Sequence, residues 1–358
     1  MTKTDAVRLL PLVLSLAACA GQIERSPEDL TGATQGGASV AEGAGTPAAV
    51  AELSSPLKGI AVDAEWIYVI DEHESVVRVP KAGGAPETLR PREEHIRYPG
   101  GIAVDDAFVY WTTLGYTARE GRVVRMPKTG GPAVVLADKQ PRPWRLAVDD
   151  TTVYWANEGI VAIGHDPTEG SVSSVPKSGG AVKVLTEQLR PLAVALDADN
   201  VYFAAGGWGG ANGAVGRVPK SGGPATVLAD NRVTIMSLAV DDGHVAWIES
   251  WMHARKVPTG GGPVVELQQT FPVLSMGGGV AAAGGQVYFA VGKASKEGVL
   301  RAYGPDGSPR DLMKTTAPEG AMSAFLAESM TVDASRVYWV DNTWTPTGPR
   351  SFIRSVPR

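Results

Sequence analysis

The sequence predicts an all-β fold, a seven-bladed β-propeller of four-stranded blades, and three observations support this prediction. A short phrase recurs seven times at intervals of 42 to 50 residues, a period typical of propeller blades. The chain of 358 residues contains 43 glycines and 26 prolines, as expected where many turns separate short strands. Its 44% content of hydrophobic residues is sufficient for a sizeable core. One long all-β domain therefore accounts for most of the chain.

The first segment, residues 1–18, is predicted to be a lipoprotein signal peptide. Its apolar run, residues 9–16, is too short to span a bilayer. The only cysteine follows in Leu16-Ala17-Ala18-Cys19, which resembles the bacterial lipobox, in which the cysteine is acylated and becomes the mature N-terminus. We expect lipidation at Cys19 and anchoring in the cell envelope; an ordinary signal peptide containing a cysteine is the alternative. Ala20 favours the outer membrane under the sorting rule of enteric-type lipoproteins.

The second segment, residues 19–47, is expected to be the lipidated cysteine followed by a disordered tether. Residues 20–47 are rich in Gly, Ala, Ser, Thr and Glu and lack hydrophobic periodicity, so they cannot bury enough surface to fold. A flexible tether of this length spans roughly 30 Å. The single cysteine allows no intramolecular disulfide, so the stability of the propeller, predicted over residues 48–358, depends on burial.

The repeated phrase is a small residue, Val and Asp, followed four residues later by Val and two aromatic residues. Its seven copies are anchored at Asp63, Asp105, Asp149, Asp197, Asp241, Ala283 and Asp333. The copy at Ala283 has lost the aspartate but keeps Val287-Tyr288-Phe289. We expect each aspartate to accept hydrogen bonds from the backbone of the following turn, which is a structural role.

Each repeat divides into four strands. Strand A is the run that ends at the aspartate, such as 101–105, and strand B is the Val-aromatic-aromatic run, whose residues suit a pleated, half-buried surface. Strand C ends in Val-Pro-Lys, as at 79–81, and strand D is an apolar run such as 134–136. A Gly-Gly pair between C and D, such as Gly130-Gly131, supplies the positive φ of a tight hairpin. The lysine of Val-Pro-Lys is also expected to be structural.

The two ends of the domain complement each other. The last repeat stops at Val356-Pro357-Arg358, after strand C, whereas residues 48–53 form an additional D-type run before the first repeat. Pairing these segments completes the last blade and removes two exposed sheet edges. We therefore predict that the N-terminal strand closes the ring.

Strand B resembles a known repeat. Tyr338-Trp339-Val340-Asp341, Tyr110-Trp111-Thr112-Thr113 and Tyr68-Val69-Ile70-Asp71 look like the YWTD repeat of low-density-lipoprotein-receptor-type propellers. This resemblance covers residues 48–358 and implies propeller architecture. The family's final aspartate is kept only at Asp71 and Asp341, and its propellers close with six blades, whereas this chain has seven repeats.

Variation in loop length is concentrated on one face of the predicted ring. Because successive strands are antiparallel, the B–C and D–A loops emerge on the same face, which we name the variable face. These loops are predicted at 112–120, 156–169, 204–213 and 340–350 (B–C) and at 90–98, 268–279 and 313–329 (D–A). Loops on a rigid scaffold commonly carry binding sites.

Aromatic residues mark the variable face as a candidate ligand site. Four tryptophans outside the repeat position are expected in its loops, where they can stack on sugars or anchor a protein; packing between loops is the alternative. The candidate ligand-binding residues are Trp144, Trp208, Trp251, Trp344, Arg97, Tyr98, Tyr116, Arg145, His165 and Glu249.

Composition narrows the function. A formal net charge of −5 gives no electrostatic basis for binding nucleic acid or acidic lipid. The five histidines show no metal-ligand spacing, so we expect no cofactor, no metal and no catalytic residues. The chain is expected to be a monomeric protein- or glycan-binding module in the envelope. Alternatives are an assembly scaffold and, third, a metal-dependent enzyme similar to gluconolactonases or streptogramin lyases.

Overall fold

The structure is a computed structural model in which part of the chain is described. The described residues are 47–92, 98–117, 119–160, 168–206, 212–241, 243–249, 253–268, 279–292, 297–316, 327–345 and 348–358. Side chains are described for all of these except residues 268, 291, 292, 297, 298, 315, 316, 327, 328, 344 and 345. No helix in the described part is long and apolar enough to cross a membrane.

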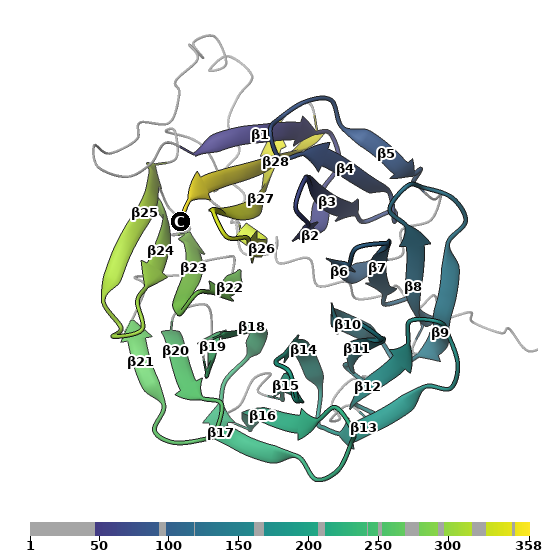
Figure 1. The fold of residues 1–358 in the computed structure, drawn as a ribbon, viewed down its shortest axis with the longest axis vertical. Helices are drawn as coiled ribbons and strands as arrows, with labels where there is room; N and C mark the ends of the chain where they lie inside the picture. Colours follow the sequence, from purple (N-terminus) through teal and green to yellow (C-terminus); the bar gives the residue numbers. More distant parts are fainter. Residues whose placement is uncertain are drawn as a thin grey trace, which may run out of the picture. The chain divides into compact units, whose positions relative to one another are not determined.

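The described elements are strands, and they form seven four-stranded antiparallel sheets (Figure 1). Blades 1 and 2 comprise β2 (Leu57–Val62), β3 (Trp66–Asp71), β4 (Val76–Pro80) and β5 (Glu87–Arg90), then β6 (Pro99–Val104), β7 (Phe108–Thr113), β8 (Gly121–Pro127) and β9 (Val134–Gln140). Blades 3 and 4 comprise β10 (Pro143–Val148), β11 (Thr152–Asn157), β12 (Ser171–Pro176) and β13 (Lys183–Glu187), then β14 (Pro191–Leu196), β15 (Asn200–Ala205), β16 (Gly213–Pro219) and β17 (Thr226–Arg232).

The other three blades have the same strand order. Blades 5 and 6 comprise β18 (Ile235–Asp241), β19 (His244–Glu249), β20 (His253–Pro258) and β21 (Val265–Gln268), then β22 (Val280–Ala283), β23 (Gln286–Gly292), β24 (Glu297–Tyr303) and β25 (Pro309–Thr316). Blade 7 comprises β26 (Ala327–Val332), β27 (Arg336–Thr345), β28 (Gly348–Pro357) and the first strand of the domain, β1 (Ala48–Leu53).

The predicted closure of the ring is confirmed. Strand β1 pairs antiparallel with β28, with Ala48 opposite Ser355 and Leu53 opposite Ser351. The innermost strands β2, β6, β10, β14, β18, β22 and β26 surround the axis in chain order (Figure 1). The seven-bladed propeller predicted from the repeats is therefore the observed fold.

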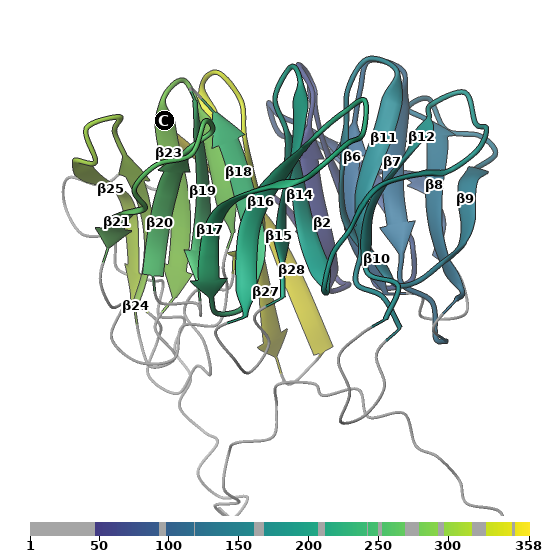
Figure 2. The ribbon, with the colours of Figure 1, turned by 90° about the horizontal axis from the view of Figure 1, so that it is seen from below.

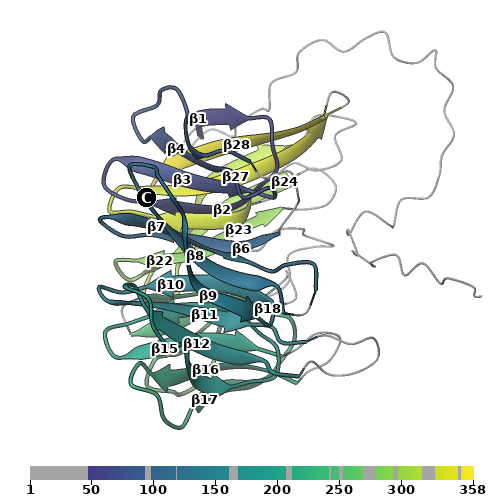
Figure 3. The same cartoon turned by 90° about the vertical axis from the view of Figure 1, so that its right-hand side faces the viewer.

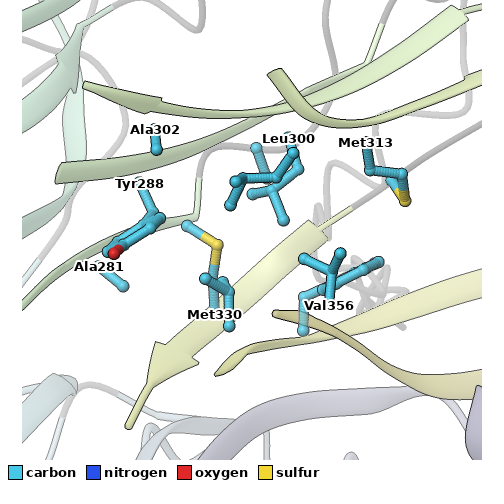
Figure 4. Packing of buried hydrophobic residues seen from close by; sticks show 11 residues of the cluster. Ala281, Tyr288, Leu300, Ala302, Met313, Met330 and Val356 are labelled. Carbon is cyan, nitrogen blue, oxygen red and sulfur yellow. The ribbon is translucent and has the colours of Figure 1, made fainter. Parts of the chain in front are cut away.

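The core is divided among the blade junctions. Seven clusters of buried hydrophobic residues are present, and each joins two neighbouring blades. Figure 4 shows the cluster between blades 6 and 7, where Met330 and Val356 of blade 7 pack towards Tyr288 and Leu300 of blade 6. The repeat-position tryptophans Trp111, Trp155, Trp247 and Trp339 are fully buried in such clusters. They pack between blades, which explains why the aromatic position recurs.

The longest hairpin extends from the variable face. In the side views, β27 and β28 reach beyond the other blades (Figures 2 and 3), because ten residues of each strand pair continuously up to Thr345 and Gly348. The prediction of a loop over 340–350 is therefore wrong. The predicted 313–329 loop is also too long, since β25 continues to Thr316 and β26 begins at Ala327. Strand pairing extended further than the repeat pattern indicated.

Candidate ligand-binding face

The innermost strands are irregular where they reach the variable face. In six blades the pairing between strands A and B shifts register near the first residue of strand A. Such bulges bend a strand and re-aim its side chains, and they are frequent next to functional sites. In blade 3 the shift lies between Pro143 and Leu146, so Trp144 and Arg145 are released from regular pairing.

Trp144 and Arg145 occupy this bulge of β10, at the mouth of the central channel. The prediction that Trp144 lies in a loop is wrong, because the strand begins one residue earlier than the tryptophan. The Trp144 side chain is half-buried, and its indole N–H donates to Glu158 Oε2 at 2.9 Å. Its carbonyl accepts a 2.5 Å hydrogen bond from the Thr112 hydroxyl of blade 2. Trp144 is thus tied to its own blade and to blade 2.

A close approach of two backbones fixes the position of Trp144. A Cβ on Gly100 would lie 2.7 Å from Trp144 Cα and 2.8 Å from the Pro143 oxygen. Real Cβ atoms do not approach backbone atoms this closely, so only glycine fits here. The innermost strands of blades 2 and 3 therefore touch directly at the variable face.

The axis of the ring holds a cavity of about 370 Å³, bounded by the innermost strands of all seven blades. Each of these strands has only one strand neighbour in its sheet, so one edge of each presents backbone N–H and C=O groups. Among the described residues that line the cavity, Arg145 is the only charged one. A cavity of this size falls within the range of small-molecule sites.

One layer of the channel shows why Arg145 is distinctive. It is formed by the residue four positions before the repeat anchor, which lines the cavity in every blade except blade 1. Outside blade 3 this residue is always small: Gly59, Gly101, Ala193, Ser237, Gly279 and Ser329. In blade 3 the same position is Arg145. A Cβ on Gly101 would lie 3.5 Å from Arg145 Cδ, so the stem of the arginine passes over Gly101 towards blade 2. The lack of a side chain at Gly101 thus leaves room for the long arginine side chain.

A buried carboxylate organises the mouth of blades 3 and 4. The Glu158 side chain is 3% exposed and forms ion pairs with Arg142 at 2.8 Å and Arg190 at 2.5 Å. Burial opposes ionisation, but the two guanidinium groups and the Trp144 indole N–H hold the pKa of Glu158 below its ordinary value. The carboxylate that accepts the Trp144 indole N–H is thus also paired with two arginines, one from each of two neighbouring blades.

A backbone conformation with positive φ recurs where strand A begins, at the rim of the variable face. Tyr98, Arg142 and Arg190 have positive φ angles of 51°, 58° and 55°. Each directly precedes the proline that starts strand A, and each carbonyl accepts a hydrogen bond from the residue after strand B. Positive φ costs on the order of 1 kcal/mol for a non-glycine residue. The recurrent strain projects three long side chains from equivalent places on the rim.

Tyr98 and Tyr116 form an aromatic pair on this rim. Their ring centroids are 6.1 Å apart, with an edge-to-face angle of 79°. Tyr116 is 59% exposed, and the Glu120 carboxylate accepts hydrogen bonds from the Tyr116 and Thr117 amides. The structure therefore brings the predicted residues Tyr98, Tyr116, Trp144 and Arg145 to the mouth of blades 2 and 3.

Glu249 lies on the same face but outside this group. It ends β19 in blade 5, is 5% exposed, and accepts a hydrogen bond from the Arg255 guanidinium at 2.5 Å. Its other oxygen accepts the Val233 amide at 3.0 Å. The Glu249 carboxylate therefore links β20 to the segment before β18 and is buried.

The other predicted site residues are not placed. Arg97, His165, Trp208, Trp251 and the lipidation residue Cys19 lie outside the described residues. Trp344 belongs to β27, so its expected location in a loop is wrong; its side chain is outside the described part. No group of three or more His, Cys, Asp or Glu side chains within the described ranges is placed to hold a metal ion.

The opposite face is formed by the repeat aspartates. Asp105 Oδ1 accepts the amides of Ala107 and Phe108 at 2.8 and 2.7 Å, and its Oδ2 accepts the hydroxyl of Tyr110 and the ammonium of Lys177. The lysine comes from the next blade and also lies over the tyrosine ring. We name this arrangement the clasp. The predicted turn role of the aspartate is confirmed, and the Val-Pro-Lys lysine proves to be its partner across the blade junction.

The clasp shifts the ionisation of its members. Burial alone would raise the pKa of Asp105, but Lys177, Tyr110 and the two turn amides lower it to about 2. Burial and the neighbouring Asp149 carboxylate raise the pKa of Tyr154 to about 12 in the next blade. Both shifts favour the charged carboxylate and the neutral phenol, which are the states that the clasp requires.

Strand B carries a further polar position near the variable face. In blade 3 the Trp155 indole donates to Asn157 Oδ1 at 3.0 Å. At the same register in blade 2, the buried Trp111 Nε1 and Thr113 Oγ1 have no hydrogen-bond partner in the described structure. Threonine is too short to repeat the contact that asparagine makes.

Comparison with known proteins gives the class only. No family model matches the chain, and no curated protein matches it. Many solved structures are similar; one is the crystal structure of the computationally designed Ika8 protein, with 14% sequence identity and a TM-score of 0.53. The match covers 87% of this chain and 98% of that chain. The chain is therefore a β-propeller protein, and this similarity concerns its fold alone.

Sequence reasoning missed the residues that support the site. Glu158 and its partners Arg142 and Arg190 are not among the predicted site residues, although an arginine directly precedes the first proline of strand A in both blades 3 and 4. Alignment of the repeats on their aspartates also distinguishes Arg145, a predicted site residue, as the one large residue in a column of small ones. The signal was present in the repeat columns rather than in any local motif.

Proposed function

We propose that this protein is an exported, lipid-anchored binding module that captures a protein or a glycan at the mouth of blades 2 and 3. The observation that carries the proposal is the Tyr98–Tyr116 pair, in which Tyr116 is exposed, at the same mouth of blades 2 and 3 where Trp144 and Arg145 occupy the bulge of β10. Rigid aromatic side chains with polar tips bury large areas on binding at little cost in conformational entropy. Bulges, positive φ angles and the Glu158 ion pairs hold these residues in place, and such preorganisation favours binding.

The binding role is tested by partner capture. Full-length protein is incubated with envelope extract, and bound material is compared with that of a Tyr98→Ala, Tyr116→Ala variant. The matched control is a Trp66→Ala, Phe108→Ala variant. It removes two half-buried aromatic residues that start strands β3 and β7, on the opposite face of the ring. Melting curves establish that each variant is folded. A partner lost only from the tyrosine variant supports the proposal, whereas equal capture by all three proteins rejects this site.

The anchor is a separate part of the proposal. The Cys19 lipobox is its basis, since acyl chains on one residue contribute ~0.8 kcal/mol for each buried CH₂ group. A Cys19→Ser variant is expected to leave the membrane fraction, and metabolic labelling with a fatty acid is expected to mark only the wild type. Labelling that persists in the variant would remove the anchor from the proposal.

An assembly scaffold is the second candidate, and the outer strands supply its observation. Exposed valines occur on consecutive outermost strands, each with an open edge: Val134 and Val135 on β9, Val184 on β13, Val227 on β17 and Val265 on β21. Open edges and apolar side chains together favour strand addition by a partner. A scaffold predicts that Val135→Lys and Val227→Lys together abolish partner capture while the tyrosine variant retains it.

A further inference from the structure

The outer part of blade 2 carries an arginine that lacks a carboxylate partner. Arg125 lies on β8 directly opposite Val134 of β9, and its guanidinium carbon is 4.6 Å from the centroid of the Phe108 ring. Arg125 Nε is buried without a hydrogen-bond partner, and no carboxylate of the described residues pairs with this side chain. A buried donor without an acceptor destabilises the fold, so this side chain suits an acceptor that a binding partner supplies.

Blade 1 shows which acceptor fits. Arg78 occupies the equivalent position there, with its guanidinium carbon 4.1 Å from the centroid of the Trp66 ring and Glu87 of β5 directly opposite. Its Nε and Nη2 both donate to Glu87 Oε2, at 2.8 and 2.7 Å. In blade 2, Val134 stands at the position of Glu87. A carboxylate is therefore the group that would complete the arrangement around Arg125.

Strand β9 is open to an added segment. It is the outermost strand of its sheet, and Val134 and Val135 on it are each 46% exposed. An open backbone edge with exposed β-branched side chains favours the addition of an extended segment. Neighbouring strands lie about 4.8 Å apart, so a residue paired with Val134 would be about 10 Å from the Arg125 backbone, which glutamate and arginine side chains together can span.

The junction of blades 2 and 3 leaves space beside Arg125. At four other junctions an added Cβ on the first glycine of the C–D turn would lie 3.1 to 3.9 Å from the outer strand of the preceding blade, at Gly130, Gly222, Gly261 and Gly307. An added Cβ on Gly179 of blade 3, like one on Gly83 of blade 1, would have nothing within 4 Å. Arg78 also donates to the Lys128 carbonyl of the next blade at 3.0 Å, and Arg125 has no such bond. Arg125 therefore stays available beside an open turn.

We propose that Arg125, Val134 and Val135, which we name the Arg125 surface, bind an extended segment of a partner protein. The segment adds to the open edge of β9 and places an aspartate or glutamate against Arg125. Charge complementarity selects this occupant, because the Arg78–Glu87 pair is the same arrangement completed within the chain. The Arg125 surface lies towards the face opposite the tyrosine pair, so the inference goes beyond the proposed function and does not depend on it.

The test uses a fluorescein-labelled peptide with blocked ends, Thr-Thr-Val-Glu-Val-Thr-Thr, and the full-length protein. Binding is followed by fluorescence anisotropy, and hydrogen exchange reports on the amides of β9. We expect saturable binding, slower exchange in β9, and about tenfold weaker binding when the glutamate is replaced by glutamine or lysine. No binding, equal binding of the three peptides, unchanged exchange in β9, or equal competition by acetate or inorganic phosphate would overturn the inference. Self-association of the protein that depends on Arg125 would assign the surface to a second copy instead.

Variants locate the site. Arg125→Gln should weaken peptide binding roughly tenfold or more, because it removes a charge-assisted hydrogen bond. Val134→Glu supplies the counterpart of Glu87 within the chain and should weaken binding to a similar extent, even if the arginine variant does not fold. Arg217→Gln and Thr226→Glu make the same two changes at the same register of blade 4 and should bind as the wild type does. Wild-type binding by Arg125→Gln and Val134→Glu would overturn the inference.

The two proposals fail in different ways. The Tyr98→Ala, Tyr116→Ala variant should bind the peptide as the wild type does, so loss of partner capture in that variant bears on the proposed function alone. A partner lost from the Trp66→Ala, Phe108→Ala variant but kept by the tyrosine variant would fit the Arg125 surface, because that variant removes the ring over which Arg125 lies. Absence of peptide binding rejects the Arg125 surface and leaves the proposed function standing.

Discussion

The clasp at Asp105 leads to a quantitative prediction about stability and pH. Its folded pKa of about 2 lies below the ordinary value of 3.8, so the ionised carboxylate stabilises the fold. At 1.36 kcal/mol for each pH unit, this difference corresponds to at most roughly 2.4 kcal/mol. The Asp105 side chain is 21% exposed, and solvent screening reduces the figure to about 1 kcal/mol. Asp105→Asn should therefore lower the free energy of unfolding at pH 7 by about 1 kcal/mol.

The sign of the pH dependence follows from the lowered pKa. Because the pKa is depressed in the folded state, the stabilisation is complete above the ordinary value and is lost as the pH falls from about 4 to about 2. Urea denaturation of wild type and Asp105→Asn should thus differ at pH 7 and converge near pH 2. Lys177→Met should cost a similar amount, and the double variant little more, because both changes remove the same interaction.

The neighbouring Asp106 supplies the matched control, since it is exposed and its substitution by Asn makes the same change in charge. Asp106→Asn should leave the free energy of unfolding within about 0.5 kcal/mol of the wild type. A loss in Asp105→Asn that is equally large at pH 2 and pH 7 would refute the electrostatic account. It would assign the effect to the turn geometry alone.

Three further predictions concern the fold. Deleting residues 48–53 should abolish cooperative unfolding of the whole ring, because β28 loses its outer partner; an unchanged melting curve would contradict the closure. Thr113→Asn should raise the melting temperature, because the restored hydrogen bond to Trp111 contributes about 1 kcal/mol to the free energy of unfolding. An unchanged melting temperature would show that leaving these two buried atoms without a hydrogen bond does not destabilise the fold. Gly100→Ala should destabilise by about 1–3 kcal/mol through backbone overpacking, whereas Gly260→Ala, with nothing within 4 Å of its added Cβ, should change stability by under about 0.5 kcal/mol; similar losses in both would refute the close-approach argument.

The fold could be predicted from the sequence because each blade repeats the same physical problem. Every junction between blades buries an aromatic residue of strand B. In most blades an aspartate after strand A accepts hydrogen bonds from the following turn, so both residue types recur at a blade-length period. The closure could be inferred because a ring with an open edge would be penalised. The lengths of individual hairpins could not, since β27 and β28 continue through residues that have no counterpart in the other blades.

The site was only partly predictable. Tyr98, Tyr116 and Arg145 could be proposed because they are conspicuous residue types near predicted loops. The role of Trp144 depended on a bulge that no local pattern announces, since Pro143 starts the strand before the register shift. The Glu158 ion pairs join residues 16 and 32 positions apart, and only the ring geometry brings them together.

The clasps are unevenly distributed, and this distribution relates the fold to the site. Complete Asp–Tyr–Lys clasps occur at four consecutive junctions, from blade 7 to blade 4, through Lys81, Lys128, Lys177 and Lys220. At the next junction Thr259 stands in the lysine position.

The remaining junctions use substitutes for the clasp. Asp241 accepts the Gly285 amide between blades 5 and 6, and Arg358 donates to the Tyr288 hydroxyl between blades 6 and 7. The mouth of blades 2 and 3 thus lies within the fully clasped part of the ring, with a complete clasp on each side. A binding site gains from rigid support, because residues held in position before binding lose less entropy when a ligand arrives. The same charged contacts that close the propeller on one face therefore preorganise the proposed ligand site on the other.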